Sequence, residues 1–122
     1  MNKQNTGNMA YHAGLSAEAQ VGADYQRRGL RLRATRWRSK AGEIDLIFNA
    51  GDEIVFVEVK KARNFSDAAR RISSRQQQRL CLAAEEYIGS QPLGSLTPMR
   101  VDAAFVNGHG DVQVLENAIG AF

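Results

Sequence analysis

Residues 42–60 have the sequence GEIDLIFNAGDEIVFVEVK. Two runs rich in β-branched and aromatic side chains, 44–48 and 54–59, flank the turn-forming residues 49–52. This pattern predicts a β-hairpin. Strands as apolar as these are typical of a sheet that is covered on both faces.

Charged side chains interrupt both strands of this hairpin. Because side chains alternate between the faces of a strand, Asp45 should lie on the face opposite to Ile44 and Leu46. By the same rule Glu58 and Lys60 should share one face of the second strand, about 7 Å apart, while its valines lie on the other face. Burying such charges costs free energy unless they are paired, hydrogen-bonded or bound to a metal ion.

Three interpretations fit these charges. The first is a half-exposed strand with a cross-strand ion pair, which is a common surface feature. The second is a pair of carboxylates that binds a hard divalent cation beside a lysine. The third is an acid–base pair for sugar chemistry. It is disfavoured because Lys60 should hold Glu58 ionised instead of raising its pKa.

The segment before the hairpin predicts a helix and a strand. We expect the helix over residues 16–28, with Ser16 as its N-cap and Gly29 as its left-handed stop. A stripe of small side chains should let this helix pack closely on the sheet. The stripe consists of Ala19, Gly22, Ala23 and Gln26.

The segment after the hairpin predicts a second helix that runs from near Ser73 to Ile88. Further strands are expected at residues 30–35, 100–106 and 112–115. The predicted fold class is therefore α/β, with a mixed β-sheet flanked by helices in the order α-β-β-β-α-β-β.

The basic residues are concentrated in one part of the chain. Fourteen of the sixteen Lys and Arg residues lie between Arg27 and Arg79, against six acidic residues, which leaves this segment a net charge of +8. The cluster adjoins the carboxylate hairpin, which favours a nucleic-acid partner over a merely solvated basic surface. The candidates for phosphate contacts are Arg36, Arg38, Lys40, Lys61, Arg63, Arg71 and Arg75.

Length and composition indicate one soluble globular domain. The chain has 122 residues, of which 43% are hydrophobic and 24% charged. We expect residues 1–13 to be a flexible lead and residues 14–122 to be the domain. The sequence contains no apolar segment typical of a signal peptide or a transmembrane helix, and its single cysteine, Cys81, suits a reducing cytoplasm.

The hairpin also carries a resemblance. Asp45 followed by Glu58-Val59-Lys60 on the next strand resembles the D…(D/E)-x-K signature of the restriction-endonuclease-like nuclease superfamily. Two longer segments resemble more narrowly the YraN-like family, namely GEIDLI at residues 42–47 and VFVEVK at residues 55–60. These are small bacterial proteins described as endonucleases akin to archaeal Holliday-junction resolvases. Flanking matches extend the resemblance over most of residues 14–122.

The resemblance implies a restriction-endonuclease-like fold and metal-dependent hydrolysis of phosphodiester bonds in DNA, including branched or junction DNA. Asp45, Glu58 and the carbonyl of Val59 would bind Mg²⁺ or Mn²⁺, and Lys60 would orient or activate the attacking water. The alternative is a non-catalytic nucleic-acid-binding module that keeps this fold. Since the resolvases are homodimers, a homodimer is expected from the resemblance alone.

Two further residues are candidates for the same site. Glu18 lies in the first turn of the expected helix, where the helix dipole already favours a carboxylate. The resemblance implies that Glu18 is an additional metal ligand. Gln76 could orient a water or a phosphate in the catalytic site. However, Ser73 and Gln76 have the spacing of a capping box, which offers a purely structural role.

Overall fold

The computed structural model describes the backbone of residues 5–68 and 72–119 and the side chains of residues 16–66 and 72–119. The described elements include two short helices, α2 and η2, that the sequence did not predict, and otherwise follow the expected order. They are α1 (Asn5–Arg27), β1 (Arg31–Arg38), β2 (Glu43–Ala50), β3 (Glu53–Lys61), α2 (Phe65–Ala68), α3 (Ser74–Gly89), the 3₁₀ helix η2 (Gly94–Leu96), β4 (Met99–Val106) and β5 (Val112–Ile119).

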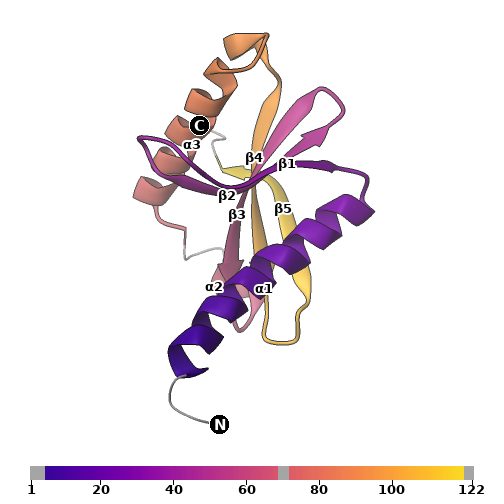
Figure 1. Ribbon diagram of the computed structural model, residues 1–122, viewed down its shortest axis with the longest axis vertical. Helices are drawn as coiled ribbons and strands as arrows, with labels where there is room; N and C mark the ends of the chain where they lie inside the picture. Colours follow the sequence, from indigo (N-terminus) through magenta and orange to yellow (C-terminus); the bar gives the residue numbers. More distant parts are fainter. Residues whose placement is uncertain (1–4, 69–71, 120–122) are drawn as a thin grey trace.

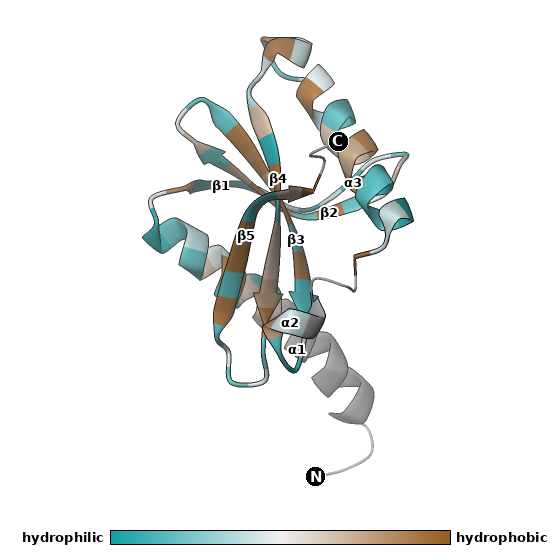
Figure 2. Cartoon of the chain, turned by 180° about the vertical axis from the view of Figure 1, so that it is seen from behind, coloured by the Kyte–Doolittle hydropathy of each residue, from teal (hydrophilic) through white to brown (hydrophobic). Residues whose placement is uncertain are grey.

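The five strands form one mixed sheet in the order β1-β2-β3-β4-β5. Strands β3 and β4 run parallel, and the other neighbours run antiparallel. A parallel pair needs a long crossover connection, which here contains α2 and α3. Helix α1 crosses one face of the sheet and α3 packs on the other, as the two opposite views show (Figure 1; Figure 2). This mixed α/β architecture confirms the predicted class and is compatible with a restriction-endonuclease-like fold.

Each face of the sheet has its own hydrophobic core. On the α3 face, Ile54 and Phe56 pack with Leu80 and other residues of α3. On the α1 face, Val55 and Val57 pack with residues of α1. Strand β3 therefore alternates as predicted, and Figure 2 shows the mainly hydrophobic character of the central strands. Because the two helices cover opposite faces of the sheet, residues of both α1 and α3 lie close to the end of β3.

Helix α1 begins at Asn5, so the prediction that it starts with Ser16 as its N-cap is wrong. Most of the expected lead, residues 1–13, is thus helical, and residues 1–4 lie outside the described part of the chain. The predicted stop is confirmed. Gly29 has a φ of 92°, and Leu30 N–H donates to the Tyr25 carbonyl at 3.1 Å to close the helix end.

The buried stripe of α1 also differs from the prediction. The buried residues are Ala17, Val21 and Tyr25, whereas Ala19 and Ala23 are exposed. Residues four apart lie on the same side of a helix, and the row that contains Val21 and Tyr25 buries more apolar area than a row of small side chains. The larger side chains therefore decided how the helix is rotated on the sheet.

Candidate functional site

The site lies where β2 and β3 separate. The paired register of these strands ends at Leu46 and Val57. Beyond this pair, the Val59 N–H donates to Asp45 Oδ2 at 2.8 Å, so a side chain replaces a backbone partner. This bond fixes the orientation of the Asp45 carboxylate beside Glu58, the residue next in sequence to Val59.

Asp45 occupies a break in the alternation of β2. Ile44 and Ile47 both pack on the α3 face, whereas Leu46 and Phe48 pack on the α1 face. The prediction that Ile44 and Leu46 share a face is therefore wrong. Because the strand changes phase at Asp45, this side chain lies at the junction of the two faces and borders a hollow on each.

Glu58 is the second carboxylate of the site and is only 7% exposed. Lys60 Nζ lies 3.5 Å from Glu58 Oε1, and Gln76 Nε2 donates to the same oxygen at 3.3 Å. Gln76 also takes part in the start of α3, because its backbone N–H donates to Ser73 Oγ at 3.2 Å. Both roles weighed for Gln76 are thus present: its backbone serves the cap, and its side chain reaches the site.

Burial and the charge of neighbouring carboxylates raise the pKa values of both carboxyl groups. The pKa of Asp45 is raised to about 6, mainly by burial and then by the charges of Glu18 and Glu43, against the stabilising bond from Val59. The pKa of Glu58 is raised to about 7, by burial and then by the charge of Asp45. Lys60 lowers the pKa of Glu58 but does not outweigh these effects.

The expectation that Lys60 holds Glu58 ionised is therefore wrong. One ammonium group is insufficient because burial and the charge of Asp45 together outweigh its effect on Glu58. Additional positive charge between them would lower both pKa values. The donor set of Asp45 and Glu58 thus suits a hard divalent cation, which prefers carboxylate and carbonyl oxygens.

Two hollows meet at Asp45 and Glu58. The first has a volume of about 230 Å³ and is bounded by residues of α3. The second has a volume of about 370 Å³ and is bounded by residues of α1. Besides the two carboxylates, the first is lined by Gly42, Glu43, Gln76, Arg79 and Leu80, and the second by Ala17, Glu18, Val59, Lys60 and Lys61. The structure thus brings together all six residues predicted for the site, while their chemical roles stay predictions.

Glu18 is engaged with a basic residue. Arg36 Nε lies 3.2 Å from Glu18 Oε2, and both side chains are partly exposed. Within the described part of the chain, no group of three or more His, Cys, Asp or Glu side chains is placed to hold a metal ion. In this conformation Asp45 and Glu58 border both hollows, whereas Glu18 borders only the second and Glu43 only the first.

Comparison with known proteins gives the family. Residues 17–106 match the family described as "Uncharacterised protein family UPF0102". The chain belongs to this family. A UPF0102 protein of Ruegeria pomeroyi is 52% identical over 108 residues, which are 88% of each chain. A relative from Roseobacter denitrificans is 50% identical over 113 residues, which are 93% of this chain and 88% of the relative. A relative from Cereibacter sphaeroides is 44% identical over 116 residues, which are 95% of this chain and 99% of the relative.

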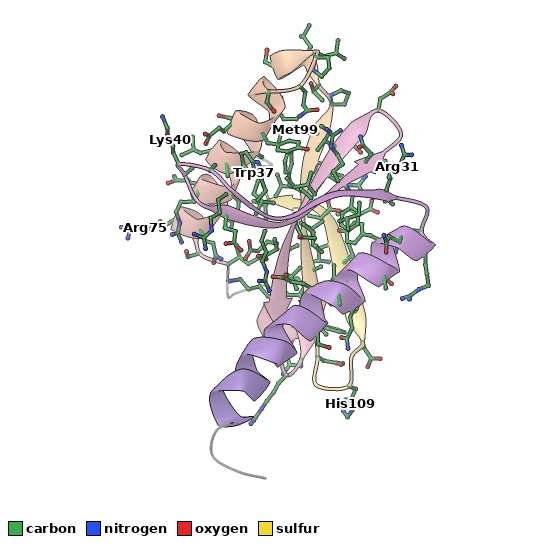
Figure 3. All side chains as sticks on the ribbon, in the orientation of Figure 1. Arg31, Trp37, Lys40, Arg75, Met99 and His109 are labelled. Carbon is green, nitrogen blue, oxygen red and sulfur yellow. The ribbon has the colours of Figure 1, made fainter. Side chains whose placement is uncertain are left out.

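The UPF0102 segment contains all seven of the predicted phosphate contacts. Lys40 and Arg75 lie on the same side of the molecule, opposite to Arg31 (Figure 3). Arg38 pairs with Glu43 at 3.3 Å but has a side chain that is 84% exposed. Lys61 and Arg63 line a further hollow of about 290 Å³ next to the site. Arg71 lies outside the described residues, and Arg36 is the partner of Glu18.

Arg79 lines the site but is not among the candidate site residues or phosphate contacts named from the sequence. It borders the hollow that contains Asp45 and Glu58. A signal was available, because Arg79 follows Gln76 by three positions and residues three apart lie on one side of a helix.

Within the part of the UPF0102 chain that the structure describes, no helix is long and apolar enough to cross a membrane.

Proposed function

We propose that this UPF0102 protein is a metal-dependent endonuclease that hydrolyses phosphodiester bonds in DNA. The observation that carries the proposal is the pair of half-buried and buried carboxylates, Asp45 and Glu58, which borders two hollows beside the Lys60 ammonium. The resemblance of the hairpin to the D…(D/E)-x-K signature supports the same reading.

The residues present fit Mg²⁺ or Mn²⁺. Asp45, Glu58 and the carbonyl of Val59 would hold the ion, because oxygen ligands on rigid strands suit hard cations. When bound, such an ion lowers the pKa of a water molecule and stabilises negative charge on a phosphate. The raised pKa values of the two carboxyl groups are the physical sign that this space favours added positive charge.

The protein's own backbone and side-chain groups would orient the two carboxylates and act on the water or the phosphate. The Val59 N–H fixes Asp45, and the Gln76 amide holds Glu58. Lys60 has three donors, of which one faces Glu58, so it can orient the attacking water or neutralise charge that develops on the phosphate. Val59 and Gln76 thus orient the two carboxylates, whereas Lys60 would act on an oxygen atom of water or phosphate.

The basic residues around the hollows would bind the sugar–phosphate backbone. Lys61 and Arg63 flank the site on one side, Arg79 lines it from α3, and Arg75 is an exposed residue of the same helix. Contacts of this kind position the substrate and make binding salt-dependent, but they carry no sequence information. Structure-selective cleavage, including that of branched DNA, is therefore a more natural outcome than sequence-specific cleavage.

A cleavage panel tests the proposal. Duplex, single-stranded, flap and four-way-junction DNA are incubated with Mg²⁺, Mn²⁺ or EDTA and with wild type, Asp45→Asn or Lys60→Ala, all purified identically. We expect cleavage by wild type with metal only, whereas both variants fold and bind DNA without cutting it. Equal cleavage by wild type and variants would show a contaminating nuclease and contradict the assignment.

A non-catalytic nucleic-acid-binding module is the second candidate. It is favoured by two observations: Glu18 is paired with Arg36, and no three-ligand group is formed among the described residues. DNA binding by wild type without cleavage of any substrate, at any metal tested, would select this candidate.

A further inference from the structure

Arg36 has an unusual backbone conformation. Its φ is 49°, in the left-handed region that costs free energy for residues other than glycine. Arg36 lies in β1 between Thr35 and Trp37, which pair with Leu46 and Ile44 of β2. The neighbour of Arg36 across these strands is therefore Asp45, and both strands are irregular at the same level of the sheet.

This conformation determines where the Arg36 side chain lies. Ala34 and Trp37 both pack towards the α3 face although they are three residues apart. Thr35 and Arg36 both line the groove between α1 and β1. In a regular strand, adjacent residues point to opposite faces. The left-handed residue thus carries the guanidinium to the α1 face, where it meets Glu18.

Glu18 lies in the wall of the cation site. It borders the same hollow as Asp45, Glu58 and Lys60, and its charge reaches Asp45. The side chain of Glu18 is 21% exposed and that of Arg36 is 37% exposed. Solvent therefore weakens this ion pair, and a stronger ligand can replace either partner.

We propose that Arg36 is a positioning residue that withholds Glu18 from the cation site until a nucleic-acid phosphate replaces Glu18 on the guanidinium. The inference rests on the proposed function. Phosphate and Glu18 are anions that compete for Arg36, while Arg36 and the cation compete for Glu18. Nucleic acid and cation must then bind with positive coupling, each raising the affinity for the other by the same factor.

The test measures Mn²⁺ affinity by calorimetric titration, with and without a short DNA duplex. Every protein is the full chain carrying Lys60→Ala, which keeps the DNA intact and is common to all arms. Without an Arg36 substitution, DNA should tighten Mn²⁺ binding about five- to tenfold. With Arg36→Gly, Mn²⁺ binding without DNA should already be tighter by about the same factor, and DNA should add little.

Matched variants distinguish the positioning of Glu18 by Arg36 from an effect on folding and from the mere loss of a positive charge. Glycine adopts the left-handed conformation freely, and Arg36→Asn, which also tolerates it, serves as a second variant if the glycine chain melts at a lower temperature. Arg31→Ala removes the same charge from the same strand and should behave like the parent. Removing a nearby charge could tighten cation binding by itself, so Arg36→Gly is repeated with Glu18→Gln, where we expect its effect to disappear.

The inference is overturned if Arg36→Gly weakens Mn²⁺ binding, leaves the coupling to DNA unchanged, or has the same effect with Glu18→Gln. In those cases Mn²⁺ still binds, and the proposed function stands. If the chain binds no Mn²⁺ with or without DNA, the cation site itself is contradicted, and the inference with it.

Discussion

At the scale of single residues, the site depends on where charge is buried. Asp45 lies at a change of phase in β2, and its carboxylate is held by the Val59 N–H. Glu58 is buried beside it with one ammonium and one amide as neighbours. Two carboxylates in such a space repel each other, which makes protons and metal ions competitors for the same position.

The free energy of unfolding should depend on the protonation of these two groups. Their pKa values of about 6 and about 7 lie above the ordinary carboxyl value of about 4, so the folded chain binds protons more tightly than the unfolded chain. The stability they contribute is complete below about pH 4 and is lost as pH rises through about 6 to 7. We expect a loss of about 1–3 kcal/mol by about pH 8.

Urea denaturation across this pH range measures the effect, with wild type compared with the double variant that carries both Asp45→Asn and Glu58→Gln. All other titrating groups are common to both chains, so the difference isolates the pair. The double variant should be the more stable chain at pH 8 and should lose the advantage in acid. Identical pH profiles for the two chains would contradict the raised pKa values.

Divalent cations should stabilise the folded chain without any nucleic acid. Mn²⁺ at a hundred times its Kd would add about 2.7 kcal/mol to the free energy of unfolding. The increase in melting temperature should be larger at pH 8 than at pH 5, because protons occupy the carboxyl groups in acid. Thermal denaturation with Mn²⁺ or EDTA measures it, and an equal shift for Asp45→Asn would place the ion elsewhere.

At the scale of secondary-structure elements, helix α3 links the fold to the site through its first turn. Ser73 caps the helix by accepting a hydrogen bond from the Gln76 N–H. In a full capping box the Gln76 side chain would return to Ser73, but here it donates to Glu58. One turn of helix therefore serves both stability and the carboxylate pair.

Substitutions in this turn should separate the two functions. Ser73→Ala removes the cap and should lower the free energy of unfolding by about 1 kcal/mol while Mn²⁺ affinity stays unchanged. Gln76→Ala keeps the cap and removes the amide that orients Glu58, so it should weaken Mn²⁺ binding more than it lowers stability. Urea denaturation and calorimetric titration of both variants check this. The opposite ranking would assign Gln76 a structural role only.

At the scale of the whole molecule, a buried charge network joins α1 to strands β4 and β5. Asp102 is 0% exposed and accepts hydrogen bonds from Tyr25 Oη at 2.7 Å, Arg100 Nε at 3.0 Å and Asn117 N–H at 2.8 Å. Burial and the Asp102 charge raise the pKa of Tyr25, so its hydroxyl stays a donor. This network anchors the helix that carries Glu18.

Removal of Asp102 should be more damaging than removal of its Tyr25 partner. Asp102→Ala leaves the Tyr25 hydroxyl and the Asn117 N–H without their acceptor, at a cost of about 1–3 kcal/mol for each unsatisfied group, while Arg100 keeps its ion pair with Glu53. Tyr25→Phe removes one hydrogen bond to a charged group and should cost about 1.5–3 kcal/mol. Chemical denaturation measures both. Equal and small losses would show that the network contributes little to stability.

Local sequence patterns were sufficient to predict several features of this structure. The hairpin, the alternation of β3, the glycine stop of α1 and the Ser73 cap each depend on residues close together in the chain. The same locality placed Asp45, Glu58 and Lys60 within one site, because a hairpin brings adjacent strands together whatever surrounds them. The excess of basic residues around the hairpin was equally visible without coordinates.

Packing between distant segments decided the rest. The rotation of α1 followed from the area buried by Val21 and Tyr25 on a sheet formed later in the chain. The pKa of Glu58 followed from burial that outweighed Lys60, and the pairing of Arg36 with Glu18 followed from a left-handed residue in β1. Burial and strand irregularities depend on all neighbours in space, and no local spacing of residues contains that information.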